Sequence, residues 1–190
     1  MPPKIKITQK QIIDAAAEVV RTQGADGLNA RNIAAAFGCS TQPIFSNFRS
    51  MAQLKSAVVE EVTARYNCFM QDEIQRGEYP PYKASGMAYI RFAKEQREWF
   101  RLLFMRDRTG EQADDGTKSL APMTEMIQKS TGLTKDEAFL LHLEMWIFVH
   151  GIATMMVTDY QDWDRELISR MLTDCYQGLL QRFLSQKKEQ

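Results

Sequence analysis

The sequence predicts an all-α protein with a three-helix N-terminal domain over residues 1–49 and a larger helical domain over residues 50–190. Nearly every apolar run repeats at the three- and four-residue spacing of a helix, and no segment alternates for long enough to form a strand. Glycine and proline stand between the periodic runs. With 190 residues and 44% hydrophobic content, the chain is long enough to bury a substantial core.

The first helix is expected from Thr8 to Gln23. Thr8 and Gln11 have the spacing of a capping box, and Gly24 follows as the expected C-cap. The apolar stripe of this helix repeats at intervals of three and four and consists of Ile12, Ile13, Ala16, Val19 and Val20.

Two short helices are expected on either side of a tight turn. The first covers residues 31–37, and either Asn29 or Ala30 occupies its N-cap position. The second has Ser40 as its expected N-cap and tolerates Pro43 in its first turn, where backbone donors have no partner within the helix.

The rest of the chain is expected to form longer helices. The Tyr-Pro-Pro sequence at 79–81 breaks the chain, and the polar segment 106–117 is predicted to be a mobile loop. The expected helices cover residues 50–77, 82–105 with a bend near 96–99, 120–130, 135–158 and 163–185.

Charge is unevenly distributed although the formal net charge is zero. Residues 1–50 hold six Lys and Arg against three Asp and Glu, so the remainder carries the matching acidic excess. A modestly basic N-terminal segment suits a small module that faces phosphates. The charge therefore permits DNA binding without establishing it.

The three cysteines lie far apart and have none of the spacings of a zinc site or a disulfide framework. The sequence thus predicts no metal and no cofactor. The N-terminus, MPPKIKITQK, is basic and lacks an apolar signal core, so we expect no secretory signal and a cytoplasmic protein.

A helix-turn-helix is predicted at residues 29–48. A helix can read DNA only if its first residues reach base edges while the preceding helix braces it across the backbone. Here the last helix of the three begins with Ser40, Thr41 and Gln42, and Asn47 follows one turn later. An ordinary helix pair inside a bundle is the alternative that spacing alone leaves open. The residues expected to hold the two helices together are Ile33, Ala34, Phe37, Ile44 and Phe48.

The segment GLNARNIAAAFGCSTQPIFSNFRSMAQL resembles the N-terminal domain of the TetR family of bacterial repressors. The resemblance covers residues 8–58 and implies that Asn29 caps the second helix near a phosphate, with Phe45 and Asn47 meeting the backbone or bases. Thr41, Gln42 and Pro43 would face the major groove. The full set of DNA-binding residues implied is Asn29, Arg31, Ser40, Thr41, Gln42, Pro43, Phe45, Asn47 and Met51.

Two of these positions depart from the family pattern. The family usually has Tyr at the position of Phe45 and Lys at that of Met51, and each normally contributes a phosphate contact. Losing both predicts weaker non-specific binding and a shallower salt dependence, because fewer counterions are released. A flexible basic arm with Lys4, Lys6 and Lys10 is expected to compensate.

The helix expected over 135–158 is apolar nearly all round, which indicates that it is covered on several sides. A membrane span here is rejected because His142, Glu144 and His150 would be costly in lipid. The last helix carries an apolar stripe suited to a four-helix interface with a second copy. The alternative is a core helix of a monomer. We expect a homodimer through the last two helices, which would bind an inverted-repeat DNA operator.

The segment from Trp146 to Gly151 resembles a Trp-to-His-Gly signature of one class of TetR-family C-terminal domains. Trp146 and His150 are one turn apart, so they could converge on one cavity, although a hydrogen-bonded core histidine is the alternative. The ligand is expected to be a small apolar or aromatic molecule that shifts the population away from the DNA-binding conformation. The expected wall residues are Phe69, Tyr89, Phe92, Phe104, Met123, Met126, Trp146 and His150.

Two other functional classes, an enzyme and a protein-binding adaptor, compete with a DNA-binding regulator. An enzyme is disfavoured because the chain has no Glu-x-x-His pair, no Cys-x-x-Cys and no glycine-rich phosphate loop, so no catalytic residues are predicted. A helical adaptor that binds only proteins stays open at this level. Salt-sensitive binding to duplex DNA would identify a regulator, because an adaptor that binds only proteins would not show it.

Overall fold

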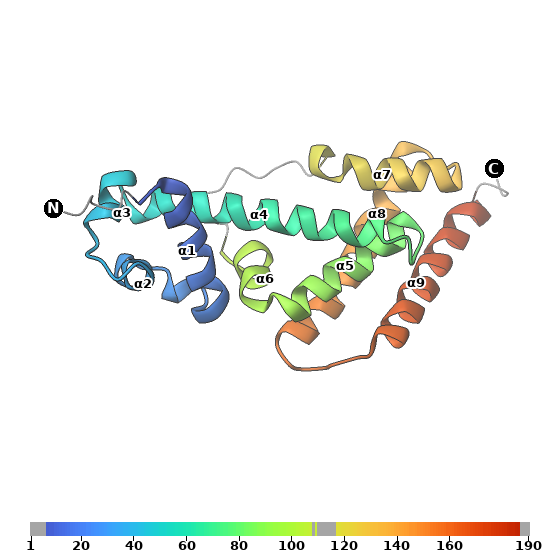
Figure 1. Cartoon of the computed structure of the whole chain (residues 1–190). Helices are drawn as coiled ribbons and strands as arrows, with labels where there is room; N and C mark the ends of the chain where they lie inside the picture. Colours follow the sequence, from blue (N-terminus) through green and yellow to red (C-terminus); the bar gives the residue numbers. More distant parts are fainter. Residues whose placement is uncertain (1–6, 108, 110–116, 187–190) are drawn as a thin grey trace. The chain divides into compact units, whose positions relative to one another are not determined.

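The computed structural model of the chain describes residues 7–107, 109 and 117–186 (Figure 1). These residues contain no strand, which confirms the predicted all-α class. The elements are α1 (Gln9–Gln23), the 3-10 turn η1 (Ala25–Gly27), α2 (Ala30–Ala36), α3 (Gln42–Asn47), α4 (Met51–Gln75), α5 (Pro81–Glu95), α6 (Arg97–Phe104), α7 (Thr117–Thr131), α8 (Lys135–Val157) and α9 (Arg165–Gln186).

The chain divides into two compact units. The first comprises residues 1–68 and 96–107, and the second comprises residues 69–95 and 108–190. This division differs from the boundary after residue 49 that the sequence indicated. Helix α6 belongs to the first unit because it packs against α1, where the Trp99 indole N–H donates to the carbonyl oxygen of Ala17 at 2.9 Å.

The first unit is built on α1, which packs against α2, α3 and α6. The predicted capping box is confirmed: the amide N–H of Gln11 donates to the Thr8 hydroxyl, and the amide N–H of Thr8 donates to the Gln11 side chain. Gly24 ends the helix with φ +75°, a backbone conformation that favours glycine. The core residues Ile12, Ala16, Val20, Ile33, Ile44, Phe48, Leu54 and Val58 are all buried.

The turn between α2 and α3 corrects one expectation. Asn29 caps α2 by accepting from the amides of Arg31 and Asn32. Ser40, however, is not the N-cap of α3, which begins at Gln42 after Thr41 and has no side-chain cap. With Pro43 in the first turn, one of the two amides that could donate to a cap at Ser40 is absent, because proline has no N–H.

The second unit is centred on α8, which packs against α5, α7 and α9. Figure 1 shows α5 (green) and α8 (orange) side by side. Helix α8 is long and apolar enough to cross a bilayer by length and composition alone, a test that buried core helices also pass. Its start is fixed by a capping box between Thr134 and Glu137.

The predicted bend near residue 96 is a break between two helices. Gln96 has φ −124° and ψ 51°, outside the helical region, and it separates α5 from α6. Most of the loop predicted over 106–117 lies outside the described residues. Helix α7 begins at Thr117, earlier than expected, and contains Pro122.

Candidate DNA-binding and ligand-binding sites

Helix α3 separates its side chains into an inner and an outer face. Ile44, and Phe48 directly after the end of α3, are buried in the first unit. Gln42 and Phe45 are exposed, and they lie three residues apart, so they share the outer face. This arrangement places the predicted DNA-reading residues outside the core, as a recognition helix requires.

The other predicted DNA-binding residues differ in how far they are exposed to solvent. Asn29 and Arg31, at the start of α2, are exposed, as is Ser40 in the turn. Their contacts with DNA remain predictions, as do those of Thr41, Pro43, Asn47 and Met51, which are half-buried.

Asn47 is engaged within the protein. Its side-chain Nδ2 donates to the carbonyl oxygen of Pro43 at 2.7 Å and to that of Ile7 at 3.4 Å. The carbonyl oxygen of Asn47 in turn accepts from Gln9 Nε2 at 2.8 Å. These bonds join the end of α3 to the start of α1. Sequence reasoning missed this role because Ile7 is 40 residues away along the chain.

We therefore expect Asn47→Ala to lower the stability of the first unit. Removing one hydrogen-bonding side chain of this kind costs about 1 kcal/mol in the free energy of unfolding. The measurement is thermal unfolding followed by circular dichroism, with Ser46→Ala as the control, since the Ser46 hydroxyl bonds only to the carbonyl of Gln42 within α3. An unchanged unfolding midpoint for Asn47→Ala would contradict this role.

Lys10 does not lie on a flexible arm. It is part of α1, and its ammonium group forms ion pairs with Asp14 at 2.7 Å and Glu61 at 3.0 Å. The hydrogen bond from Lys10 lowers the pKa of the Asp14 carboxyl below its usual value. Lys4 and Lys6 lie outside the described residues. Arg49, two residues before Met51, is an exposed cation in this region.

Most predicted ligand-binding residues pack against each other in the second unit. Phe69 and Phe92 meet edge to face, with ring centroids 5.4 Å apart. Met123 and Met126 are half-buried on α7. Phe104 belongs to the first unit, where its ring lies 5.2 Å from that of Tyr66.

Two tyrosine–histidine pairs join α5 to α8. Tyr82 and His142 share a hydrogen bond of 2.9 Å through the His Nδ1, and Tyr89 and His150 share one of the same length. Burial lowers the pKa of both histidines below the ordinary value of 6.5, which favours the neutral imidazole. Trp146 stacks on His150 with ring centroids 5.3 Å apart and is 42% exposed. The predicted shared face of Trp146 and His150 is therefore present.

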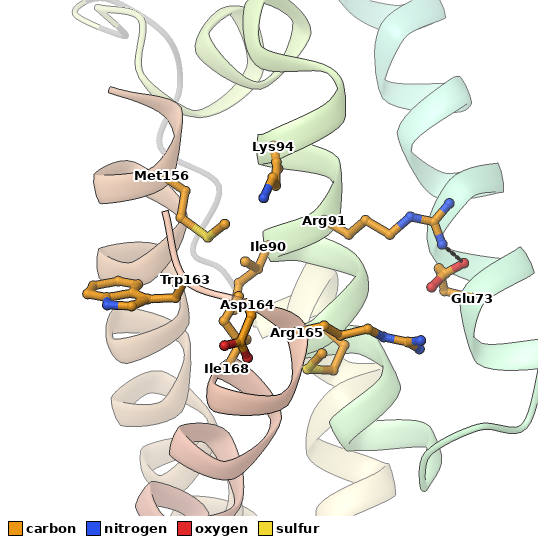
Figure 2. Close-up of a pocket in the computed structure, with 10 residues that line it drawn as sticks. Glu73, Ile90, Arg91, Lys94, Met156, Trp163, Asp164, Arg165 and Ile168 are labelled. Carbon is orange, nitrogen blue, oxygen red and sulfur yellow. Dashed lines mark hydrogen bonds and ion pairs between the residues drawn. The ribbon is translucent and has the colours of Figure 1, made fainter. Parts of the chain in front are cut away.

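A pocket of about 140 Å³ lies elsewhere in the second unit, between α5 and the start of α9 (Figure 2). Its apolar lining consists of the buried residues Met87, Ile90, Met156 and Ile168. None of the eight predicted ligand-binding residues lines it. The remaining lining residues are Glu73, Arg91, Lys94, Trp163, Asp164 and Arg165.

Ion pairs hold most of the charged side chains at this pocket, namely those of Glu73, Arg91, Lys94 and Arg165. Arg91 bonds to Glu73, as the dashed line in Figure 2 shows, and Lys94 bonds to Asp162 at 2.6 Å. The guanidinium of Arg91 also lies over the Phe69 ring, 4.8 Å from its centroid. Sequence reasoning missed these cations because the spacing within α5 does not reveal which acids on α4 and beyond α8 lie beside them. Among the described residues, no group of His, Cys, Asp and Glu could hold a metal ion.

Comparison with known proteins identifies this architecture. Residues 12–58 match the model of bacterial regulatory proteins of the tetR family, and residues 82–175 match that of the tetracyclin repressor-like C-terminal domain. The chain belongs to the TetR family. Members of this family are DNA-binding transcription regulators that respond to ligands, and the chain is such a regulator. None of the curated proteins matches it.

Solved structures share the TetR fold along nearly the whole chain. A protein of unknown function from Rhodococcus sp. RHA1 is 19% identical with a TM-score of 0.68, covering 95% of this chain and 96% of its own. A TetR-like transcriptional regulator from the same organism is 15% identical with a TM-score of 0.61, covering 97% and 98%. The multidrug binding protein EbrR, solved with imidazole, is 17% identical with a TM-score of 0.59, covering 88% and 93%. At these identities the likeness concerns the fold alone.

Proposed function

We propose that this TetR-family regulator is a cytoplasmic homodimeric repressor that binds an inverted-repeat operator and is released by a small molecule. The observation that carries the proposal is an apolar helix face left uncovered within one chain. Leu140, Ile147 and Met155 on α8 are exposed, and Ile147 is 59% exposed. With Gly151 they form the outer face of α8, because spacings of seven and eight residues return to one side of a helix.

Helix α9 continues this apolar surface. Its stripe divides in two, since Ile168, Leu172 and Phe183 are buried within the chain. The half-buried residues Met171, Cys175 and Leu179 recur every four residues on another side. A two-fold partner that packs its own α8 and α9 here would cover both helices in a four-helix interface.

Two glycines support a close approach by the partner. Gly151 on α8 and Gly178 on α9 are helical, yet a Cβ added to either would meet no atom within 4 Å apart from its chain neighbours and the nearby backbone of its own helix. Packing within the chain therefore does not require glycine at these positions. Glycine costs helix stability relative to alanine, which a close helix–helix contact with a second copy would offset.

The pocket between α5 and α9 supports a compact effector with an apolar part. The two methionines and two isoleucines of its lining offer an adaptable apolar surface. The ion-paired Arg91, Lys94 and Arg165 add polar partners that the expected purely apolar site lacked. An effector that binds only the conformation unfit for DNA would weaken operator binding by the coupling free energy, typically about 1–3 kcal/mol.

The test measures the mass of the protein in solution and its binding to duplex DNA. Size-exclusion chromatography with light scattering is expected to give twice the 21.9 kDa chain mass at micromolar concentration. An operator selected from random duplex DNA is expected to be an inverted repeat whose binding weakens as salt increases. A monomer that binds no duplex DNA at low salt would refute the proposal.

Within this function, Gln42→Ala is expected to weaken operator binding at least about fivefold without changing dimerisation. An exposed glutamine at the start of a recognition helix can pair with an adenine edge, and such a contact contributes about 1–3 kcal/mol of discrimination. Fluorescence anisotropy with the selected operator provides the measurement. Gln75→Ala, at another exposed glutamine, the last residue of α4, is the matched control. Equal affinities for both variants would remove Gln42 from the reading face.

A further inference from the structure

The most exposed large apolar side chain in the described part of the first unit lies on the recognition helix. Phe45 is 52% exposed, and Met105, the next in that unit, is 40% exposed. A single exposed apolar residue on a protein surface is ordinary. The position of Phe45 is nevertheless notable, because Phe45 follows the exposed Gln42 by one turn and lies with it on the outer face of α3.

The neighbouring polar side chains on α3 are bonded within the protein. The Ser46 hydroxyl donates to the carbonyl oxygen of Gln42 at 2.9 Å. The Asn47 amide donates to Pro43 and Ile7, as described above. No hydrogen bond of the Gln42 side chain occurs within residues 7–107. Of the exposed side chains of α3, Gln42 and Phe45 are thus the two that make no hydrogen bond within residues 7–107.

A phenyl ring can recognise one feature of a base-pair edge in the major groove. It has no hydroxyl, so it cannot donate a hydrogen bond to a phosphate or a base. The 5-methyl group of thymine is the one apolar group that the major groove presents, and phenylalanine is among the side chains that contact it. We propose that Phe45 packs against the 5-methyl group of a thymine in each operator half-site and so selects thymine there.

This inference rests on the proposed operator binding, in which α3 enters the major groove. It also gives Phe45 a role other than the phosphate contact expected from the family's usual tyrosine. The contact reads sequence, whereas a phosphate contact only positions the protein. Burying one methyl group against the ring corresponds to about a fourfold change in affinity.

The experiment replaces each thymine of the selected operator, one position at a time, with deoxyuridine. This replacement removes the 5-methyl group and keeps base pairing with adenine. Affinities are measured by fluorescence anisotropy at one fixed salt concentration. With the unmodified protein, one thymine in each half-site is expected to show about a fourfold loss on replacement.

Variants then assign that thymine to Phe45. With Phe45→Ala, affinity for the parent operator falls, and deoxyuridine at the same position causes no further loss. Phe45→Leu, which keeps an apolar side chain, should retain part of the sensitivity. Tyr160→Ala is the matched control, because Tyr160 is an exposed aromatic residue, 73% exposed, in the loop after α8. It should leave the deoxyuridine penalty unchanged.

The outcomes separate the inference from the function beneath it. If the protein binds its operator but no thymine is sensitive to deoxyuridine, the inference is overturned and the proposed function stands. The same holds if Phe45→Ala and Phe45→Leu keep the full penalty. If no operator is selected and duplex DNA binding is absent, both fail.

Discussion

Ile147→Asp is expected to convert the proposed dimer into monomers. Ile147 is 59% exposed in the single chain, so a carboxylate there costs the folded monomer little. In the dimer the same carboxylate would be buried in an apolar four-helix interface without a partner. Two-fold symmetry places the substitution in the interface twice. We expect dimerisation to weaken by roughly a hundredfold or more.

The measurement is light scattering over a concentration series, with operator affinity measured in parallel. Monomers bind one half-site at a time, so affinity for the full inverted repeat should fall with dimerisation while weak half-site binding persists. Tyr160→Asp is the control, since it introduces the same charge at an exposed residue in the loop after α8, away from the proposed interface. A dimer that survives Ile147→Asp unchanged would place the interface elsewhere.

Local signals predicted most helix boundaries correctly because their physics involves residues a few positions apart. The Thr8–Gln11 capping box and Gly24 with its positive φ fixed both ends of α1. Asn29 could be recognised as a cap from its residue type alone. Ser40 was wrong as a cap because α3 begins later, at Gln42, so residue type alone did not locate the start of this helix.

Contacts between distant segments could not be predicted in this way. Helix α6 belongs to the first unit through a hydrogen bond between Trp99 and Ala17, which are 82 residues apart. Helical periodicity shows that Trp99 faces a core but not which core. The same holds for the pocket, whose lining joins α4, α5, α8 and α9.

In the candidate sites too, features set by neighbouring residues could be predicted, whereas contacts between distant segments could not. The exposed positions of Gln42 and Phe45 follow from helix periodicity and from the apolar Ile44 and Phe48 opposite them. The internal bonds of Asn47 depend on where residue 7 lies in space, so residue type alone suggested a DNA contact instead. For His150, the alternative of a hydrogen-bonded histidine agrees with its bond to Tyr89.

Trp99→Ala is expected to cause the largest loss of stability in the first unit. The Trp99 side chain is buried, its indole N–H bonds to Ala17 at 2.9 Å, and the Arg65 guanidinium lies 5.2 Å from the ring centroid. Truncating a buried tryptophan to alanine costs about 3–5 kcal/mol in the free energy of unfolding, because transfer free energy is lost and a cavity remains. Arg65 would lose its aromatic partner but keep its ion pairs with Asp14 and Glu61.

Amide hydrogen exchange is the suitable measurement, since two compact units need not unfold together. Protection is expected to fall in α1 and α6 of the Trp99→Ala variant, with smaller changes in α8 and α9. Trp99→Phe removes the indole N–H while keeping most of the ring, so it should lose less protection than Trp99→Ala. Trp163→Ala, at the half-buried tryptophan of the pocket, should spare α1. Equal protection of α1 in the Trp99→Ala and unmodified proteins would mean that α6 does not hold α1 in place.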